Sequence, residues 1–110
     1  MANNIAHFPA EIRALAEFDG PFDAFRLPGE HCDVHFASYP ARTSIPTHSH
    51  PTNNVGVITK GMLILTIDGE QTSYGTGDWY HVPPGVDHSA DFEVDSAEIE
   101  FWFRSHCDRS

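Results

Sequence analysis

The sequence predicts a small all-β protein, an antiparallel barrel or sandwich, with a short helix or turn near its N-terminus. Apolar and polar residues alternate with a period of two over most of the chain, which is typical of strands with one buried face. Glycine, proline and Asp-Gly breakers separate these runs, and no helical pattern intervenes between them. The 110 residues, 40% hydrophobic and 20% charged, suit one globular domain over residues 1–110.

The expected elements follow from this pattern. A short helix is expected over residues 9–18, where Ile12 and Leu15 would share one side. Strands are expected around residues 25–27, 32–37, 48–50, 55–59, 62–67, 70–74, 79–82, 90–94 and 97–103. Asp68-Gly69 stands between two of these runs and predicts a type I′ hairpin turn, because that turn needs two positive φ angles.

Charge and cysteine content limit the possible partners. The chain has 16 acidic residues against 6 Lys and Arg, and its formal net charge of −10 repels phosphate backbones and anionic lipids. No run reaches the roughly 18 apolar residues of a membrane span, and the first residues do not resemble an export signal. Cys32 and Cys107 lie far apart without a CxxC pair, which argues against a disulfide framework. We therefore expect a cytoplasmic protein that binds neither nucleic acid nor membranes.

The segment His48-Ser49-His50 is the first candidate for a binding site. In a strand, alternate side chains share a face, so the two imidazoles would point toward one place. An isolated pair of this kind is a weak signal, and a plain surface or core role is the ordinary alternative. The spacing of later residues strengthens the metal interpretation. These residues are Asn54, Gly61, Gly77, Pro83, Gly85 and His88.

The two stretches that contain these residues resemble the paired motifs of the cupin superfamily. The first motif runs glycine, five residues, HxH, three or four residues, glutamate, six residues, glycine. The second runs glycine, five residues, PxG, two residues, histidine, three residues, asparagine. The chain departs from the motifs at three positions: Arg42 and Asn54 replace the first glycine and the glutamate, and Phe92 replaces the final asparagine.

The resemblance implies a fold, a metal and a set of ligands. The fold would be an antiparallel double-stranded β-helix, or jelly-roll barrel, with its motif core over residues 42–92. One divalent transition metal ion, Zn, Ni, Mn or Fe, would bind His48, His50 and His88, with Asn54 as the fourth protein ligand. Alternatively, Asn54 only hydrogen-bonds a neighbour and water completes the coordination. Similarity to small cupins also implies a homodimer.

An amide in place of the carboxylate ligand has a chemical consequence. It keeps an oxygen donor but removes a negative charge, so the bound ion stays more electrophilic. This favours Lewis-acid chemistry over oxidation of iron. Some small cupins that open unsaturated uronate rings in pectin degradation are similar in carrying an amide here.

Three functions remain open from the sequence. The first is a Lewis-acid enzyme acting on a small-molecule substrate, a sugar acid or keto compound, by isomerisation or lyase chemistry. Its acid or base would be Glu100, with Tyr80 as a second catalytic candidate. Further candidates are Glu98, Tyr39 and Tyr74. The second is a non-haem Fe(II) dioxygenase, and the third is a non-catalytic module that senses a ligand or a metal.

The last predicted strand, residues 97–103, has two possible orientations. Period two places Glu98, Glu100 and Trp102 on one face and the apolar residues on the other. Burial energy favours turning the apolar face inward, whereas a catalytic role needs Glu100 inside; both orientations stay open. We expect the other histidines to have no metal-binding role, with His81 half-buried against a backbone carbonyl and the rest at the surface. The rest are His7, His31, His35 and His106.

Overall fold

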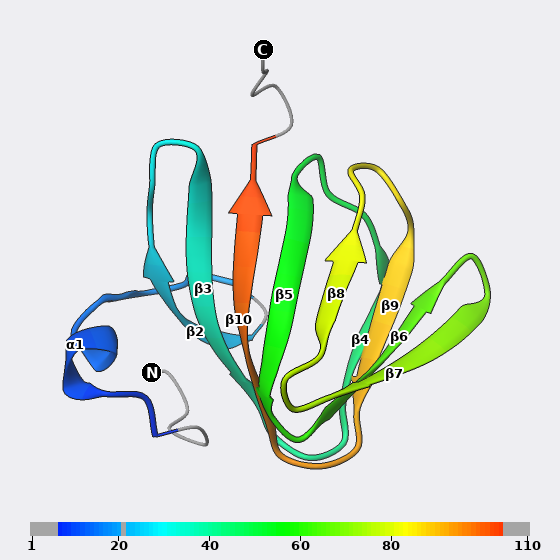
Figure 1. Ribbon diagram of the computed structural model, residues 1–110, viewed down its shortest axis with the longest axis horizontal. Coiled ribbons are helices and arrows are strands. Elements are labelled where there is room, and N and C mark those ends of the chain that lie inside the picture. Colours follow the sequence, from blue (N-terminus) through cyan, green and yellow to red (C-terminus); the bar gives the residue numbers. More distant parts are fainter. Residues whose placement is uncertain (1–6, 21, 105–110) are drawn as a thin grey trace.

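The computed structural model describes residues 7–20 and 22–104, and it confirms the all-β prediction. The described chain forms two antiparallel sheets (Figure 1). The larger sheet has the order β1 (Ala16–Glu17), β2 (Asp23–Leu27), β3 (Cys32–Tyr39), β10 (Ser96–Phe103), β5 (Asn53–Lys60) and β8 (Trp79–Val82). The smaller sheet has the order β4 (Thr43–His48), β9 (His88–Phe92), β6 (Met62–Ile67) and β7 (Glu70–Gly75).

The path of the chain defines a double-stranded β-helix. From β3 onward the chain passes back and forth between the two sheets, and only β6 and β7 are successive strands of one sheet. Every strand pair is antiparallel, as the short, helix-free connections predict. The predicted jelly-roll architecture is therefore confirmed.

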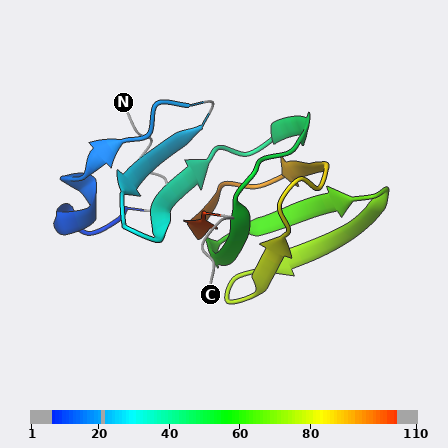
Figure 2. The ribbon, with the colours of Figure 1, turned by 90° about the horizontal axis from the view of Figure 1, so that it is seen from above.

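The N-terminal segment differs from the prediction. Helix α1 spans only Ala10–Arg13, and residues 16 and 17 pair with β2 as strand β1. A one-turn helix has little stability of its own, so the end of the segment pairs with a sheet edge instead. Phe8, Ile12 and Leu15 then pack over the outer face of the larger sheet in a second hydrophobic cluster. Figure 2 shows α1 and the β6–β7 hairpin at opposite ends of the molecule.

Two of the turns with left-handed backbone bear on the sequence predictions. Asp68 and Gly69, with φ angles of 52° and 78°, form the positive-φ pair that the Asp-Gly signal predicts. Arg42 has a φ of 67°, at the position where the cupin motif has glycine. A left-handed conformation suits glycine because it has no Cβ, so the arginine adopts the same backbone at a cost in strain.

The main core lies between the two sheets. It contains apolar residues from both, including Ile58 and Leu65, and the stacked rings of Tyr39 and Phe92, whose centroids are 4.0 Å apart. No helix among residues 7–20 and 22–104 is long and apolar enough to cross a membrane.

Candidate metal centre and acid pair

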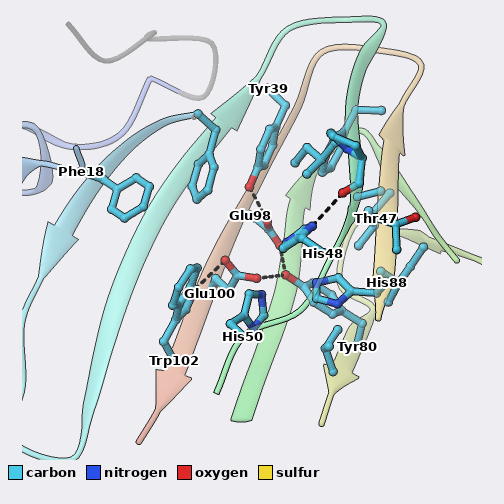
Figure 3. Close-up of a pocket in the computed structure, with 18 residues that line it drawn as sticks. Phe18, Tyr39, Thr47, His48, His50, Tyr80, His88, Glu98, Glu100 and Trp102 are labelled. Carbon is cyan, nitrogen blue, oxygen red and sulfur yellow. Dashed lines mark hydrogen bonds between the residues drawn. The ribbon is translucent and has the colours of Figure 1, made fainter. Parts of the chain in front are cut away.

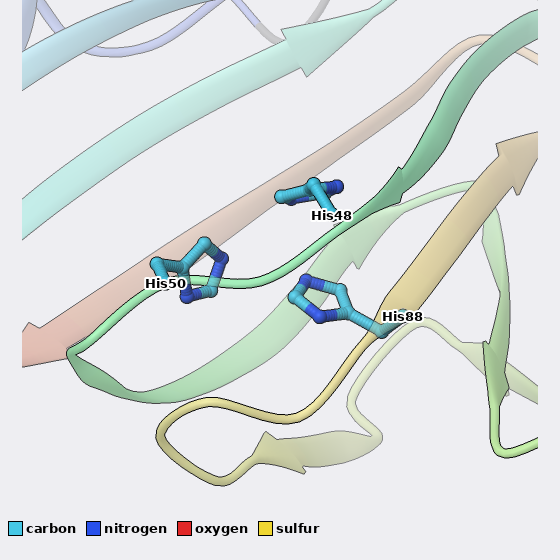
Figure 4. A group of neighbouring side chains, drawn as sticks. All are labelled: His48, His50 and His88. Atoms are coloured by element: carbon cyan, nitrogen blue, oxygen red, sulfur yellow. The ribbon is translucent and has the colours of Figure 1, made fainter.

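The three predicted histidine ligands converge on one place (Figure 4). One nitrogen from each of His48, His50 and His88 lies within 4.8 Å of the other two. His48 is the last residue of β4 and pairs with His88, the first residue of β9. His50 lies beyond the end of β4, so the prediction that residues 48–50 form one strand is wrong. Pairing of neighbouring strands and the turn that follows β4 therefore bring the histidines together.

Backbone carbonyls orient two of the imidazoles. His48 Nδ1 donates to the Pro46 carbonyl at 2.8 Å, and His88 Nδ1 donates to the Val86 carbonyl at 3.0 Å. With the proton held on Nδ1, each ring keeps the Nε2 lone pair free for a ligand, an arrangement typical of metal-binding histidines.

The electrostatics of the triad favour neutral rings. Burial, together with the neighbouring His88 and His48, lowers the pKa of His50 to about 4. Burial also lowers the pKa of His88. Neutral imidazoles are the form that binds a metal, so the donor set fits a divalent transition ion. Zinc–nitrogen bonds of ~2.0–2.1 Å place two ligand atoms at most ~4 Å apart, so the rings would draw slightly together on binding.

Asn54, the predicted fourth ligand, lies at the edge of this triad and is fully buried. Its Oδ1 accepts a 2.7 Å hydrogen bond from the Thr52 hydroxyl, and its Nδ2 lies 3.5 Å from His50 Nε2. In this orientation the amide nitrogen, not the oxygen, faces the histidine. Ligation would require a rotation of the amide group, and it stays a prediction.

A buried acid pair lies beside the histidines (Figure 3). Glu98 and Glu100 on β10 are 3% and 9% exposed. The Tyr80 hydroxyl contacts a carboxyl oxygen of each, Glu98 at very short distance and Glu100 at 2.6 Å. Tyr39 donates to the other oxygen of Glu98 at 2.8 Å, and Trp102 Nε1 donates to the other oxygen of Glu100 at 2.7 Å. All four carboxyl oxygens thus have a partner.

This network requires a shared proton. The Tyr80 hydroxyl has one proton, which it donates to one of its two carboxyl contacts. The second contact then needs a proton on the other carboxyl group, with the tyrosine oxygen as acceptor. Burial raises the pKa of both Glu98 and Glu100, and the charge of Glu100 raises the pKa of Glu98 further. The pair therefore holds one proton between its two carboxyl groups at neutral pH.

Two neighbouring residues fix the position of the acid pair. Gly56 lies beneath the Tyr80 ring, and a Cβ there would come within 2.4 Å of a ring carbon. The glycine therefore lets the tyrosine approach the strand closely. Trp102 stacks on the ring of His50, with centroids 5.1 Å apart, while its indole nitrogen binds Glu100. The tryptophan thus connects the metal triad to the acid pair.

The orientation of β10 that the sequence left open is the one with the acids inside. Glu98, Glu100 and Trp102 line a cavity of about 450 Å³ between the sheets, whereas Phe103 is exposed. The outer face of the sheet tolerates apolar residues because the N-terminal segment covers part of it. Tyr80 and the three histidines line the same cavity.

The remaining histidines follow the prediction only in part. His35, expected at the surface, is 2% exposed and lies between Phe18 and Trp102, with ring centroids 4.7 and 4.6 Å away. Strand β3 turns His35 inward because the next residue, Phe36, faces the second hydrophobic cluster on the outer side of the sheet. His81 is exposed and contacts the Asn53 side chain, not a backbone carbonyl. His7 and His31 are exposed as expected, and His106 and Cys107 lie outside the described residues.

Sequence reasoning missed two aromatic residues of the cavity. Phe18 and Phe22 line it from the segment between β1 and β2. Their rings stack with centroids 4.9 Å apart. No motif spacing marks them, because they reach the cavity only through the pairing of the N-terminal strands with β3.

The double-stranded β-helix, with a histidine triad at an internal cavity that could hold a metal ion, places the chain in the class of jelly-roll barrels. The family model described as the cupin domain matches residues 35–102, and the chain belongs to this family. No curated protein matches the sequence.

Several solved structures share the fold. An RmlC-like cupin from Shewanella frigidimarina is 21% identical, with a TM-score of 0.76 and coverage of 93% of this chain and 94% of that chain. KdgF from Halomonas sp. is 20% identical, with a TM-score of 0.68 and coverage of 76% and 79%. A cupin superfamily protein from Desulfitobacterium hafniense is 12% identical, with a TM-score of 0.69 and coverage of 91% and 86%. At these identities the likeness concerns the fold alone.

Proposed function

We propose that the protein is a metal-dependent enzyme that acts on a small oxygenated substrate by isomerisation or lyase chemistry. One observation supports this proposal above the others: a buried pair of carboxyl groups, both hydrogen-bonded to Tyr80, lines the same cavity as the three histidines. A structural role does not need two adjacent buried carboxyl groups, which are costly to place in a core. Perturbed carboxyl groups in a cavity are typical of acid–base sites.

The residues of the chain have distinct tasks in this proposal. His48, His50 and His88 would hold the divalent ion, with Asn54 as an additional ligand. The bound ion would polarise a carbonyl or hydroxyl oxygen of the substrate. Glu100 in its ionised form takes a proton from a carbon adjacent to the carbonyl group of the substrate, and the protonated member of the pair returns a proton elsewhere on the substrate. Tyr80, bonded to both carboxyl groups, passes the proton between them.

The first test of the proposal is the metal. We expect His88→Ala to lose most of its bound Zn²⁺ or Mn²⁺, because two imidazoles form a much weaker site than three. Metal content after purification and dialysis, measured by mass spectrometry, gives the result. His81→Ala is the matched control, since His81 is exposed on the larger sheet and should leave metal content unchanged. Stoichiometric metal in His88→Ala at micromolar free ion would refute the triad.

The second test is the acid pair. We expect Glu100→Gln to keep its metal but to lose turnover by ~10²–10⁴-fold, the usual contribution of a general acid or base. The assay uses a panel of keto compounds and keto-sugars in deuterium oxide and measures how fast substrate protons exchange with solvent deuterium. Loss of metal together with turnover would instead mean that Glu100 only supports the triad.

One other function has a specific observation in its favour. The cavity is lined mainly by apolar side chains, as in modules that bind a ligand without converting it. If compounds of the panel bind but none exchanges a proton with solvent, the protein is a non-catalytic binding module. Oxygen uptake by the Fe(II)-loaded protein would favour the dioxygenase.

A further inference from the structure

We infer that the substrate of this site is an uncharged, largely apolar carbonyl compound and not a sugar acid. This inference deepens the proposed function and rests on it, since the carbonyl oxygen is the group that would meet the metal. The cavity of about 450 Å³ has the size of a small-ligand site. Its shape is given by aromatic and aliphatic residues from both sheets, with Phe22, Leu63, Leu65, Ala90 and Phe92 among them.

The part of the chain that the structure describes offers no positive side chain to an anionic substrate in the cavity. None of the described lining residues is Lys or Arg. The described arginines near the larger sheet have other partners: Arg26 and Arg104 form ion pairs with Asp33, at 3.0 and 2.9 Å. A carboxylate away from the metal would also meet the negative charge of the acid pair. Burying such a group without a counter-charge is costly.

The cavity also offers few free hydrogen-bonding groups to a polyhydroxylated substrate. Among the described residues that line it there is no Asn, Gln or Ser, and Thr47 supplies one hydroxyl. The other polar groups beyond the histidines are engaged with one another, because Tyr39, Tyr80 and Trp102 all bind the acid pair. Each sugar hydroxyl left without a partner would weaken binding by about five- to hundredfold.

The acid pair and the histidines therefore form a small polar region on an otherwise apolar wall. Tyr80 and Glu100 lie in that region with His48, His50 and His88 (Figure 3). A molecule that fits both parts has one oxygenated group and an apolar remainder, such as an aryl or branched-alkyl ketone. Burial of that remainder against the aromatic and aliphatic wall would supply most of its affinity.

A matched pair of probes tests the inference on the Zn²⁺-loaded protein. The probes are para-isopropylacetophenone and para-acetylbenzoate, which share the ketone and the ring and differ in whether the far end is an apolar or a charged group of similar shape. D-galacturonate is the third probe and represents the sugar acids. Isothermal titration calorimetry measures the three affinities. We expect the isopropyl ketone to bind at least about tenfold more tightly than either acid.

A charge introduced into the wall should reverse this preference. Ile45 is half-buried and lines the cavity, so Ile45→Arg should strengthen para-acetylbenzoate binding and weaken binding of the isopropyl ketone. Ser44→Arg is the matched control. Ser44 is the exposed neighbour of Ile45 on the same strand and does not line this cavity, so its substitution should change neither affinity. Thermal unfolding checks that both variants are folded.

The outcomes separate this inference from the proposed function. Equal or tighter binding of either acid to the unsubstituted protein, or no binding of the isopropyl ketone, would overturn the apolar substrate class. Neither result would alter the metal content of the protein or the loss of turnover expected for Glu100→Gln. Conversely, if His88→Ala kept its metal while the isopropyl ketone still bound most tightly, the metal-dependent enzyme would be refuted. The cavity would then be an apolar ligand site.

Discussion

At the scale of single residues, Asn54 determines how many protein atoms the metal could bind. Its side chain has no solvent exposure, and its amide nitrogen lies 3.5 Å from His50 Nε2. An oxygen ligand at this place would have to exchange its bond with the Thr52 hydroxyl for one with the ion. A carboxylate has two equivalent oxygens and needs no such choice, since one can face Thr52 and the other the ion.

This difference gives a prediction for Asn54→Glu. We expect divalent metal to bind about 10–100-fold more tightly, because the carboxylate adds a negative charge and is a better donor than an amide. Bound iron should shift toward the ferric state for the same reason. Competition with a metal-sensitive chelator dye measures the affinity. Asn53→Glu is the control, as residue 53 precedes the site and contacts His81 instead. Unchanged affinity in Asn54→Glu would mean that the side chain does not reach the ion.

At the scale of elements, strand β10 carries the acid pair and determines its protonation. It lies between β3 and β5, in the middle of the larger sheet, so its inward side chains are shielded by strands on both sides. Tyr39 on β3 and Tyr80 on β8 reach the pair from two other strands of the same sheet. The shared proton therefore depends on the pairing of four strands.

The protonation of the acid pair on β10 predicts how the stability of the metal-free protein changes with pH. The pKa of Glu98 is raised from 4.5 to about 8 in the folded state, mainly by burial. The folded protein then holds a proton that the unfolded chain has released, so this contribution is complete below about pH 4.5 and is lost as the pH rises toward 8. We expect stability to fall between about pH 6.5 and 8, above the range in which His50 titrates.

Guanidinium unfolding of the protein and of Glu98→Gln checks this. Glutamine keeps a neutral side chain of the same size at all pH values, so the variant should lose less stability over this interval. Asp87→Asn is a control in which an acid outside the cavity lining is neutralised, and it should keep the pH dependence of the unsubstituted protein. Identical slopes for Glu98→Gln and the unsubstituted protein would contradict a protonated pair.

At the scale of the whole molecule, the outer face of the larger sheet is only partly covered. The N-terminal cluster packs over Phe25 and Phe36, but Trp79 and Phe103 are 57% and 39% exposed. Trp79 stacks on Phe101 with ring centroids 6.2 Å apart, which extends the apolar surface along the sheet. Apolar surface of this kind is typical of contacts between subunits.

We therefore predict a homodimer that uses this face. Light scattering over a range of concentrations should give twice the mass of the chain, and Trp79→Glu should shift it to the monomer. Met62→Glu is the matched control, since Met62 is 44% exposed but belongs to the smaller sheet. A monomer at every concentration of the unsubstituted protein would refute the prediction. The single domain over residues 1–110 and the cytoplasmic location likewise stay predictions.

The sequence by itself determined most of the strands, the Asp68-Gly69 turn and the three histidines. These are local properties, because alternation, turn chemistry and motif spacing depend on residues close together in the chain. The histidine motif could therefore be identified without the structure, and with it the family.

Only the tertiary structure decided which faces of the strands point inward. A period-two pattern divides a strand into two faces but does not say which one is covered, since that depends on distant segments. In β10 the face with the two glutamates lines the cavity, and in β3 the face with His35 and Tyr39 points inward, because the N-terminal segment packs on part of the opposite face. That long-range packing buries His35 and the acid pair. It also brings Phe18 and Phe22 to the cavity.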